Sequence, residues 1–232
     1  MTATLETTHL FREIHEQPAV VARLLDTQRA PVAELARAIR RHAPTHVVIA
    51  ARGTSDNAAR YAQYVLGVRH ELLVGLAAPS ILTVYGRALR FAGSLVIGIS
   101  QSGTSPDIVS VVAEARRQGA LTAAITNTPG SELAWAAELV VDLGAGEERA
   151  VAATKTYTAQ LAAVALLSAS LGDDDDAFAA LERVPAAIEE ALGDRAHVAE
   201  AAERWRDIER SVVIGRGFHY ATAFEIALKL KE

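Results

Sequence analysis

Apolar residues alternate along this chain between two kinds of segment. Short apolar runs rich in β-branched residues, typical of strands buried on both faces, are separated by longer segments with helical spacing of apolar positions. The strand-like runs are 45–51, 71–77, 94–99, 121–126 and 138–143. This alternation is typical of βαβ units. It predicts an α/β fold, a three-layer αβα sandwich around a five-stranded parallel sheet.

Helical patterns flank the strand-rich region. Residues 19–42 and 155–171 have helical spacing, and so do residues 177–208. The run Ser211–Ile214 then predicts another strand, followed by a glycine turn and a helix over 220–232. This repeats the strand–turn–helix order of residues 46–66. We therefore expect an N-terminal helical segment (1–45), a complete α/β domain (46–190), and a linker helix with the first βα unit of a second, similar domain (191–232).

Composition limits the class of protein. The chain has 232 residues, of which 50% are hydrophobic, so it can bury a core larger than a minimal domain's. Its formal net charge of −5 argues against a nucleic-acid partner. The absence of cysteine excludes disulfides, cysteine-ligated metals and thiol nucleophiles. With no secretory signal or long uncharged apolar run, we expect a cytoplasmic protein without a membrane partner.

Two predicted loops at strand ends are rich in small hydroxyl residues. They are Gly53-Thr54-Ser55 and the run Ser100-Gln101-Ser102-Gly103-Thr104-Ser105, and each leads into a predicted helix. Backbone N–H groups at a helix N-terminus, together with hydroxyl donors, suit a phosphate. Neither loop matches the P-loop or the G-x-G-x-x-G dinucleotide pattern. The plainer interpretation is that these residues only cap helices.

Five motifs in order resemble the SIS (sugar isomerase) domains of glucosamine-6-phosphate synthases and SIS-type deaminases, which are flavodoxin- or Rossmann-like. The motifs are Arg52-Gly53-Thr54-Ser55, Ile99-Ser100-Gln101-Ser102-Gly103, Ile125-Thr126-Asn127, Val151-Ala152-Ala153-Thr154-Lys155 and EIALKLKE (225–232). The resemblance runs from about residue 11 to the last residue. It implies a phosphosugar aldose–ketose isomerase or deaminase that needs no cofactor and no metal. It also implies a homodimer whose small-molecule partner is a sugar phosphate.

The resemblance also implies a role for particular residues. The phosphate ligands would be Ser100, Gln101, Ser102 and Ser105, with Thr54 beside them, while Ser55 and Val151 would line the sugar. Glu232 would move a proton between C1 and C2 of the open-chain sugar, with Lys229 and Glu225 beside it on one helix face. A carboxylate base and a nearby cation are what enediolate chemistry requires. Without the motifs, these three charges would be interpreted as ordinary surface pairs on a helix.

Some positions depart from the synthase pattern. Ala153 replaces a common serine and Arg52 a frequent cysteine, and the chain lacks the cysteine that glutamine hydrolysis requires. We therefore expect conversion of glucosamine 6-phosphate to fructose 6-phosphate and ammonia. Family members continue beyond the matching glutamate, so we expect a truncated chain with weak or no turnover. The alternatives are a non-catalytic sugar-phosphate module or regulator, and a nucleotide-binding domain, which the lack of lysine in both loops disfavours.

Overall fold

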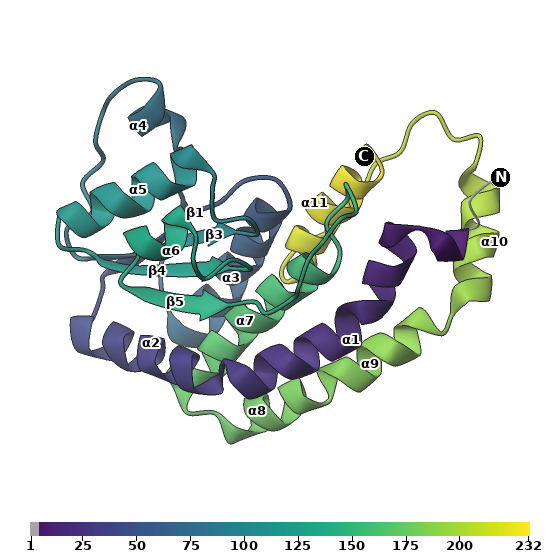
Figure 1. Ribbon diagram of the computed structural model, residues 1–232, viewed down its shortest axis with the longest axis horizontal. Helices are drawn as coiled ribbons and strands as arrows, with labels where there is room; N and C mark the ends of the chain where they lie inside the picture. Colours follow the sequence, from purple (N-terminus) through teal and green to yellow (C-terminus); the bar gives the residue numbers. More distant parts are fainter. Residues whose placement is uncertain (1–4) are drawn as a thin grey trace.

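The computed structural model describes residues 5–232 and contains the expected five-stranded parallel sheet (Figure 1). The sheet order is β2-β1-β3-β4-β5, with every neighbouring pair parallel. The strands are β1 (His46–Ala50), β2 (Val74–Leu76), β3 (Ser94–Ser100), β4 (Leu121–Thr126) and β5 (Leu139–Asp142). The α/β prediction is confirmed. The first four residues of the expected N-terminal segment lie outside the described part.

Helices cover both faces of the sheet. One face packs against α2 (Arg29–His42), α3 (Thr54–His70) and α7 (Lys155–Gly172), and the other against α4 (Ser80–Thr83), α5 (Pro106–Arg117) and α6 (Glu132–Ala136). Alternate strand residues divide between the two cores: Leu95 and Ile97 face α3 and α7, whereas Val96 faces α5. Burial on both faces explains why the strands are continuous apolar runs.

α1 (His9–Thr27) extends from the sheet domain alongside the helices that follow α7 (Figure 1). The segment 177–208, expected to be helical, contains α8 (Asp175–Glu182), α9 (Val184–Leu192) and α10 (Arg195–Trp205). Pro185 lies in the first turn of α9, where its missing N–H is tolerated, and Gly193 follows the end of that helix. The helical character expected for 177–208 is therefore confirmed, and it is spread over three helices.

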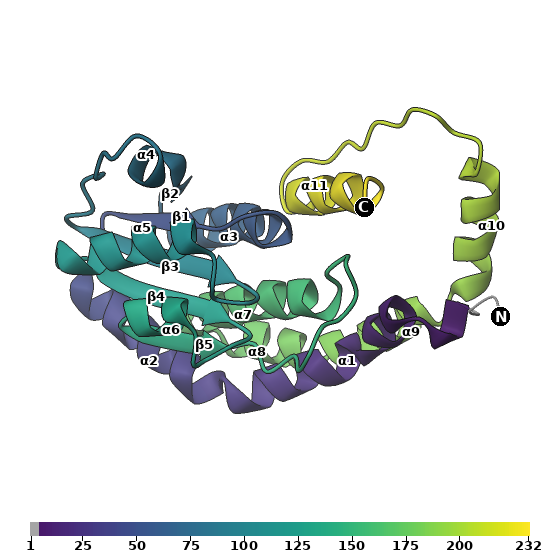
Figure 2. The ribbon, with the colours of Figure 1, turned by 45° about the horizontal axis from the view of Figure 1, so that its top comes forward.

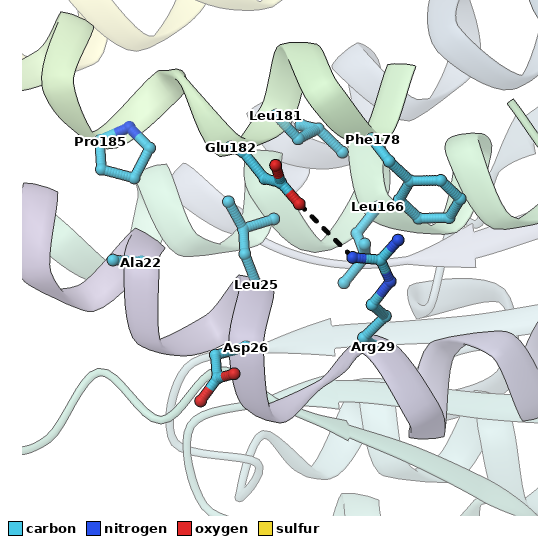
Figure 3. A pocket seen from close by; sticks show the side chains of 9 residues that line it. All are labelled: Ala22, Leu25, Asp26, Arg29, Leu166, Phe178, Leu181, Glu182 and Pro185. Carbon is cyan, nitrogen blue, oxygen red and sulfur yellow. Dashed lines mark ion pairs between the residues drawn. The ribbon is translucent and has the colours of Figure 1, made fainter. Parts of the chain in front are cut away.

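A pocket of about 290 Å³ lies between α8 and the helices α1, α2 and α7 (Figure 3). Arg29 of α2 forms an ion pair with Glu182 at 3.5 Å, and its guanidinium lies 4.5 Å from the centre of the Phe178 ring. Leu25 and Leu166 line the same pocket. These contacts belong to helix packing, and no residue of the strand-end loops lines this pocket.

The segment between α10 and α11 (His219–Lys229) has neither helix nor strand. Figure 2 shows it arching back from α10, so that α11 lies near α3 and α7. The expected strand at 211–214 is not formed, and Val212 and Ile214 are 84% and 89% exposed. A strand requires a neighbour for its backbone hydrogen bonds, and no described strand lies beside this segment. Within residues 5–232 no helix combines the length and apolarity needed to span a bilayer.

Candidate functional site

The two hydroxyl-rich loops flank the point where the strand order reverses. The chain passes from β1 to β2 on one side and then returns to β3 on the other side of β1. In open parallel sheets, ligands bind beyond the carboxyl ends of the strands at such a point. Gly53-Thr54-Ser55 follows β1 and 100–105 follows β3. The topology therefore brings the two predicted loops together.

The loop after β1 turns through Gly53, whose φ of +54° is the left-handed conformation that glycine adopts readily. Thr54 and Ser55 then form the first turn of α3. The Ser55 Oγ is buried and accepts a hydrogen bond from Gln160 Nε2 at 2.9 Å. The Thr54 Oγ1 donates to Glu225 Oε1 at 3.0 Å. The Thr54 hydroxyl thus already contacts a carboxylate, so its expected place beside a phosphate would require a different partner.

Hydrogen bonds within the loop after β3 shape it. Ser100 Oγ accepts from the Gly103 N–H at 3.1 Å, and Ser102 Oγ accepts from Thr104 Oγ1 at 3.0 Å. Gly103 has a φ of +64°, and a Cβ at this position would lie 2.0 Å from Ser131 Oγ. Ser105 precedes Pro106, the first residue of α5, and its hydroxyl does not cap that helix. The first N–H groups of α5 are therefore not capped by the Ser105 side chain.

The loops after β1 and β3 form two walls of the site, and residues 143–154 form a third. Glu148 accepts hydrogen bonds from Thr154 N at 2.9 Å, from Thr154 Oγ1 at 3.2 Å and from Thr156 N at 3.2 Å, and also from the Thr156 hydroxyl. The buried Glu13 of α1 accepts from Arg149 N at 2.6 Å and from Ala150 N at 3.0 Å. Val151 lies at the tip and is 94% exposed. Two carboxylates thus fix the loop that presents Val151.

The three walls enclose a pocket of about 160 Å³. Four of the seven predicted ligand residues line it, namely Thr54, Ser55, Gln101 and Val151. Ser100, Ser102 and Ser105 belong to the adjoining loop but do not line this pocket. Its complete lining is Arg52, Thr54, Ser55, Gln101, Glu148, Ala150, Val151, Ala153, Thr156 and Gln160.

Arg52 connects the two loops. Its Nη1 lies 3.0 Å from Asp107 Oδ2 in the first turn of α5, and the Arg52 side chain is largely exposed. A guanidinium at this position offers several donors to an anion bound between the loops. Within residues 5–232, no group of three or more His, Asp or Glu side chains is arranged to hold a metal ion.

α11 brings its charged residues against α3. Glu225, which is 6% exposed, accepts from Thr54 and also from Asn57 Nδ2 at 2.7 Å. Lys229 Nζ lies 3.4 Å from Glu225 Oε1 and 2.6 Å from Glu232 Oε2. The structure therefore brings the three predicted catalytic residues together. Glu232 follows the last helical residue, however, so the expectation of one shared helix face is wrong for it.

These three residues adjoin the pocket but do not line it, and Thr54 connects the two groups. Burial, followed by the negative charge of Glu225, raises the pKa of Tyr157 on α7. That hydroxyl has no hydrogen-bond partner within the described residues. Tyr157 therefore stays neutral at physiological pH.

The sequence did not identify several residues that build the site. Glu13 and Gln160 act through partners on distant segments, and Glu148 acts through Thr154 and Thr156, six and eight positions further on; periodicity reveals neither kind of contact. Asn127 belongs to one of the five motifs, but the motif assigned it no role. It accepts from Ala145 N and donates to the Gly146 carbonyl, both at 2.7 Å, so it fixes the start of the third wall. The signal for Gln160 is a lone amide in an alanine-rich helix.

Comparison with known proteins places this geometry in a family. Residues 41–170, more than half of the chain, match the SIS domain model. The chain belongs to the SIS domain family. The glutamine–fructose-6-phosphate aminotransferase (isomerizing) of Shewanella oneidensis is 33% identical over 97% of this chain, and that of Methanothermobacter thermautotrophicus is 36% identical over 96%. This chain spans 39% and 37% of the length of these relatives.

Solved SIS structures agree. A candidate phosphosugar isomerase from Silicibacter pomeroyi DSS-3 is 37% identical, with a TM-score of 0.88 over 97% of this chain and 68% of that one. The C-terminal domain of glucosamine-fructose-6-phosphate aminotransferase from Francisella tularensis is 26% identical, with a TM-score of 0.84 over 99% of this chain and 69% of that one. The family and the SIS fold expected from the five motifs are confirmed.

Proposed function

We propose that this SIS domain chain binds an amino-sugar phosphate such as glucosamine 6-phosphate and carries the groups that convert it to fructose 6-phosphate and ammonia. The observation that carries the proposal is the Lys229 ammonium, which lies between the carboxylates of Glu225 and Glu232. This trio adjoins the pocket at the switch point of the sheet through Thr54. The family and its named relatives support a sugar-phosphate isomerase role.

The proposed chemistry assigns a role to each group. The phosphate binds to the loop 100–105 and the N-terminus of α5, while Ser55 and Val151 contact the sugar. The carboxylate of Glu232 takes the C2 proton of the open-chain aldehyde, and the Lys229 ammonium stabilises the enolate oxygen that forms at C1. Return of the proton to C1, with transfer of one nitrogen proton to the C1 oxygen, gives an imine at C2. Water adds to this imine to form a carbinolamine. The new C2 hydroxyl then passes its proton to the nitrogen and becomes the ketone, and ammonia leaves with the electron pair of the C–N bond.

The position of Glu232 favours a second candidate, a sugar-phosphate-binding module without turnover. Glu232 lies beyond the end of α11 and outside the pocket lining. A base must lie within hydrogen-bond distance of the proton that it abstracts. If α11 keeps this position when sugar is bound, the pocket binds the phosphosugar without chemistry.

Calorimetric titration separates these candidates from a protein that binds no phosphosugar. We expect glucosamine 6-phosphate and fructose 6-phosphate to bind the wild-type chain, and Ser102→Ala to weaken both. Ser110→Ala is the matched control, because Ser110 lies on α5 and only donates to the Pro106 carbonyl. Absence of binding by the wild-type chain would refute both candidates.

An ammonia-release assay with glucosamine 6-phosphate then distinguishes enzyme from binding module. Release that is lost in Glu232→Gln supports the deaminase. Binding without any release supports the module. Turnover that persists in Glu232→Gln would contradict the assignment of the base.

A further inference from the structure

Gln160 is an unusual residue for its place in α7. It lies in an alanine- and leucine-rich stretch between Ala159 and Ala162, and it is 1% exposed. Its Oε1 has no hydrogen-bond partner within the described residues. A half-paired amide is costly to bury, and an apolar side chain of similar volume would avoid that cost. The contact made by the other half of the amide accounts for its presence.

That contact is with a pocket residue from another helix. Gln160 Nε2 donates to Ser55 Oγ at 2.9 Å, and both side chains are buried. Gln160 lies in the second turn of α7 and Ser55 in the first turn of α3. Both line the same pocket. The amide therefore acts on the one serine of the β1 loop that faces the pocket.

The direction of this bond determines what Ser55 offers to a ligand. A serine hydroxyl has one O–H donor and two acceptor lone pairs. Gln160 occupies one lone pair, so the proton of Ser55 turns away from the amide. We infer that Gln160 is a positioning residue that holds the Ser55 hydroxyl as a hydrogen-bond donor toward a neutral oxygen of the bound sugar.

A neighbouring pair of pocket residues, Thr156 and Glu148, is arranged in a similar way. Thr156 lies four residues before Gln160 and thus on the same face of α7. Its hydroxyl and its N–H both donate to Glu148, and Thr156 and Glu148 line the pocket too. Both polar side chains on this face are therefore fixed by partners in other segments. Such fixed polar groups are what a preorganised binding site requires.

The inference rests on the proposed function and narrows its ligand. A donor at Ser55 favours a hydroxyl or carbonyl oxygen, which can accept, over an ammonium, which can only donate. We therefore expect the sugar atom next to Ser55 to be an oxygen. Gln160→Glu reverses the bond, because a carboxylate only accepts and draws the Ser55 proton to itself.

The test is calorimetric titration of the full chain with fructose 6-phosphate and, separately, with inorganic phosphate. Gln160→Met should weaken fructose 6-phosphate binding about three- to tenfold, the range expected for one hydrogen bond. Phosphate binding should not change, because the phosphate loop is untouched. Gln160→Glu should also weaken fructose 6-phosphate binding, which tests the same bond with an isosteric residue. Gln118→Met is the control, since the Gln118 amide forms hydrogen bonds with Leu89, Phe91 and Glu114 and does not line the pocket.

A second cycle tests whether Gln160 acts through Ser55. Ser55→Ala should weaken fructose 6-phosphate binding, and adding Gln160→Met should cause no further loss. Additive losses would overturn the inference, and so would unchanged binding in both Gln160 variants. An equal loss of phosphate affinity would show a general disturbance of the fold and would overturn it too. If the wild-type chain binds phosphate but no phosphosugar, the proposed function itself fails.

Discussion

Asn57 Nδ2 donates to Glu225 Oε2 at 2.7 Å, and both side chains are buried between α3 and α11. Thr54 donates to the other carboxylate oxygen. Aromatic rings make further contacts between α3 and α11. The Tyr64 and Tyr220 rings lie 6.0 Å apart, and the Arg60 guanidinium lies 4.4 Å from the centre of the Phe224 ring. Glu225 thus has a docking role besides any part in chemistry.

We therefore predict that Glu225→Ala loosens α11. The change leaves the buried Asn57 amide and the Thr54 hydroxyl without their acceptor, and hydrogen bonds to a charged group contribute about 1.5–3 kcal/mol. Hydrogen exchange of amides in 219–229 should rise about ten- to a hundredfold, while exchange in β3 stays unchanged. Glu225→Gln, which keeps one acceptor, should give an intermediate effect. Unchanged protection of α11 in Glu225→Ala would contradict the docking role.

Gly103 provides a test of the loop after β3. An alanine at this left-handed position carries backbone strain of about 1–2 kcal/mol, and its Cβ would also collide with Ser131. Gly119→Ala is the matched control, because Gly119 has a φ of +79° but an added Cβ there would meet no atom within 4 Å. In urea titrations Gly103→Ala should lose clearly more stability than Gly119→Ala. Equal losses would mean that the loop relaxes around the added methyl.

Asp107 places a negative charge where we propose that a phosphate binds. We predict that Asp107→Asn tightens phosphosugar binding about two- to fivefold, since it removes repulsion and frees Arg52. Arg52→Gln should weaken binding, and both effects should shrink at high salt. Glu114→Gln is the control, because Glu114 pairs with Arg117 at the far end of α5. Weaker binding in Asp107→Asn would show that this carboxylate supports the ligand.

His70 predicts a pH dependence of stability. Burial is the largest influence and lowers its pKa from 6.5; a hydrogen bond with the backbone of Ser168 opposes this shift, and the charge of Arg69 adds a smaller lowering. The unfolded chain then binds a proton more readily than the folded chain. The contribution of His70 to the free energy of unfolding is therefore complete above about pH 6.5 and is lost as the pH falls toward the folded pKa.

Urea unfolding at pH 8 and pH 5.5 checks this. Wild type should lose more stability between the two values than His70→Gln, which keeps a hydrogen-bonding group near Ser168 but does not titrate. Parallel losses in the two proteins would contradict the shift.

The sequence predicted the sheet well because its signals are local. Each strand is an apolar run such as Ser94–Ser100, which would be buried whatever the order of the strands in the sheet. The ends of these runs also indicate where the loops begin. The strand expected at 211–214 failed for the complementary reason. Its β-branched residues fit a strand, but a strand also needs a neighbour, and propensity contains no information about neighbours.

The supporting residues of the site were beyond the same reasoning. Glu13 lies 136 positions before the backbone N–H of Arg149 that it holds, and Gln160 is separated from Ser55 by 105 positions. Such pairs leave no periodic signal in one sequence. The motifs located the residues expected to touch a ligand, whereas the folded chain shows what orients them.

The segment 206–218 between α10 and α11 has no helix or strand, and this changes how α11 is held. α11 packs against α3 and is joined to α10 by this segment, which acts as a tether. The effective concentration of α11 at α3 is therefore set by the length and stiffness of the tether. Lengthening or stiffening this tether would tune how often Glu225 and Lys229 are present beside the pocket, without altering any pocket residue.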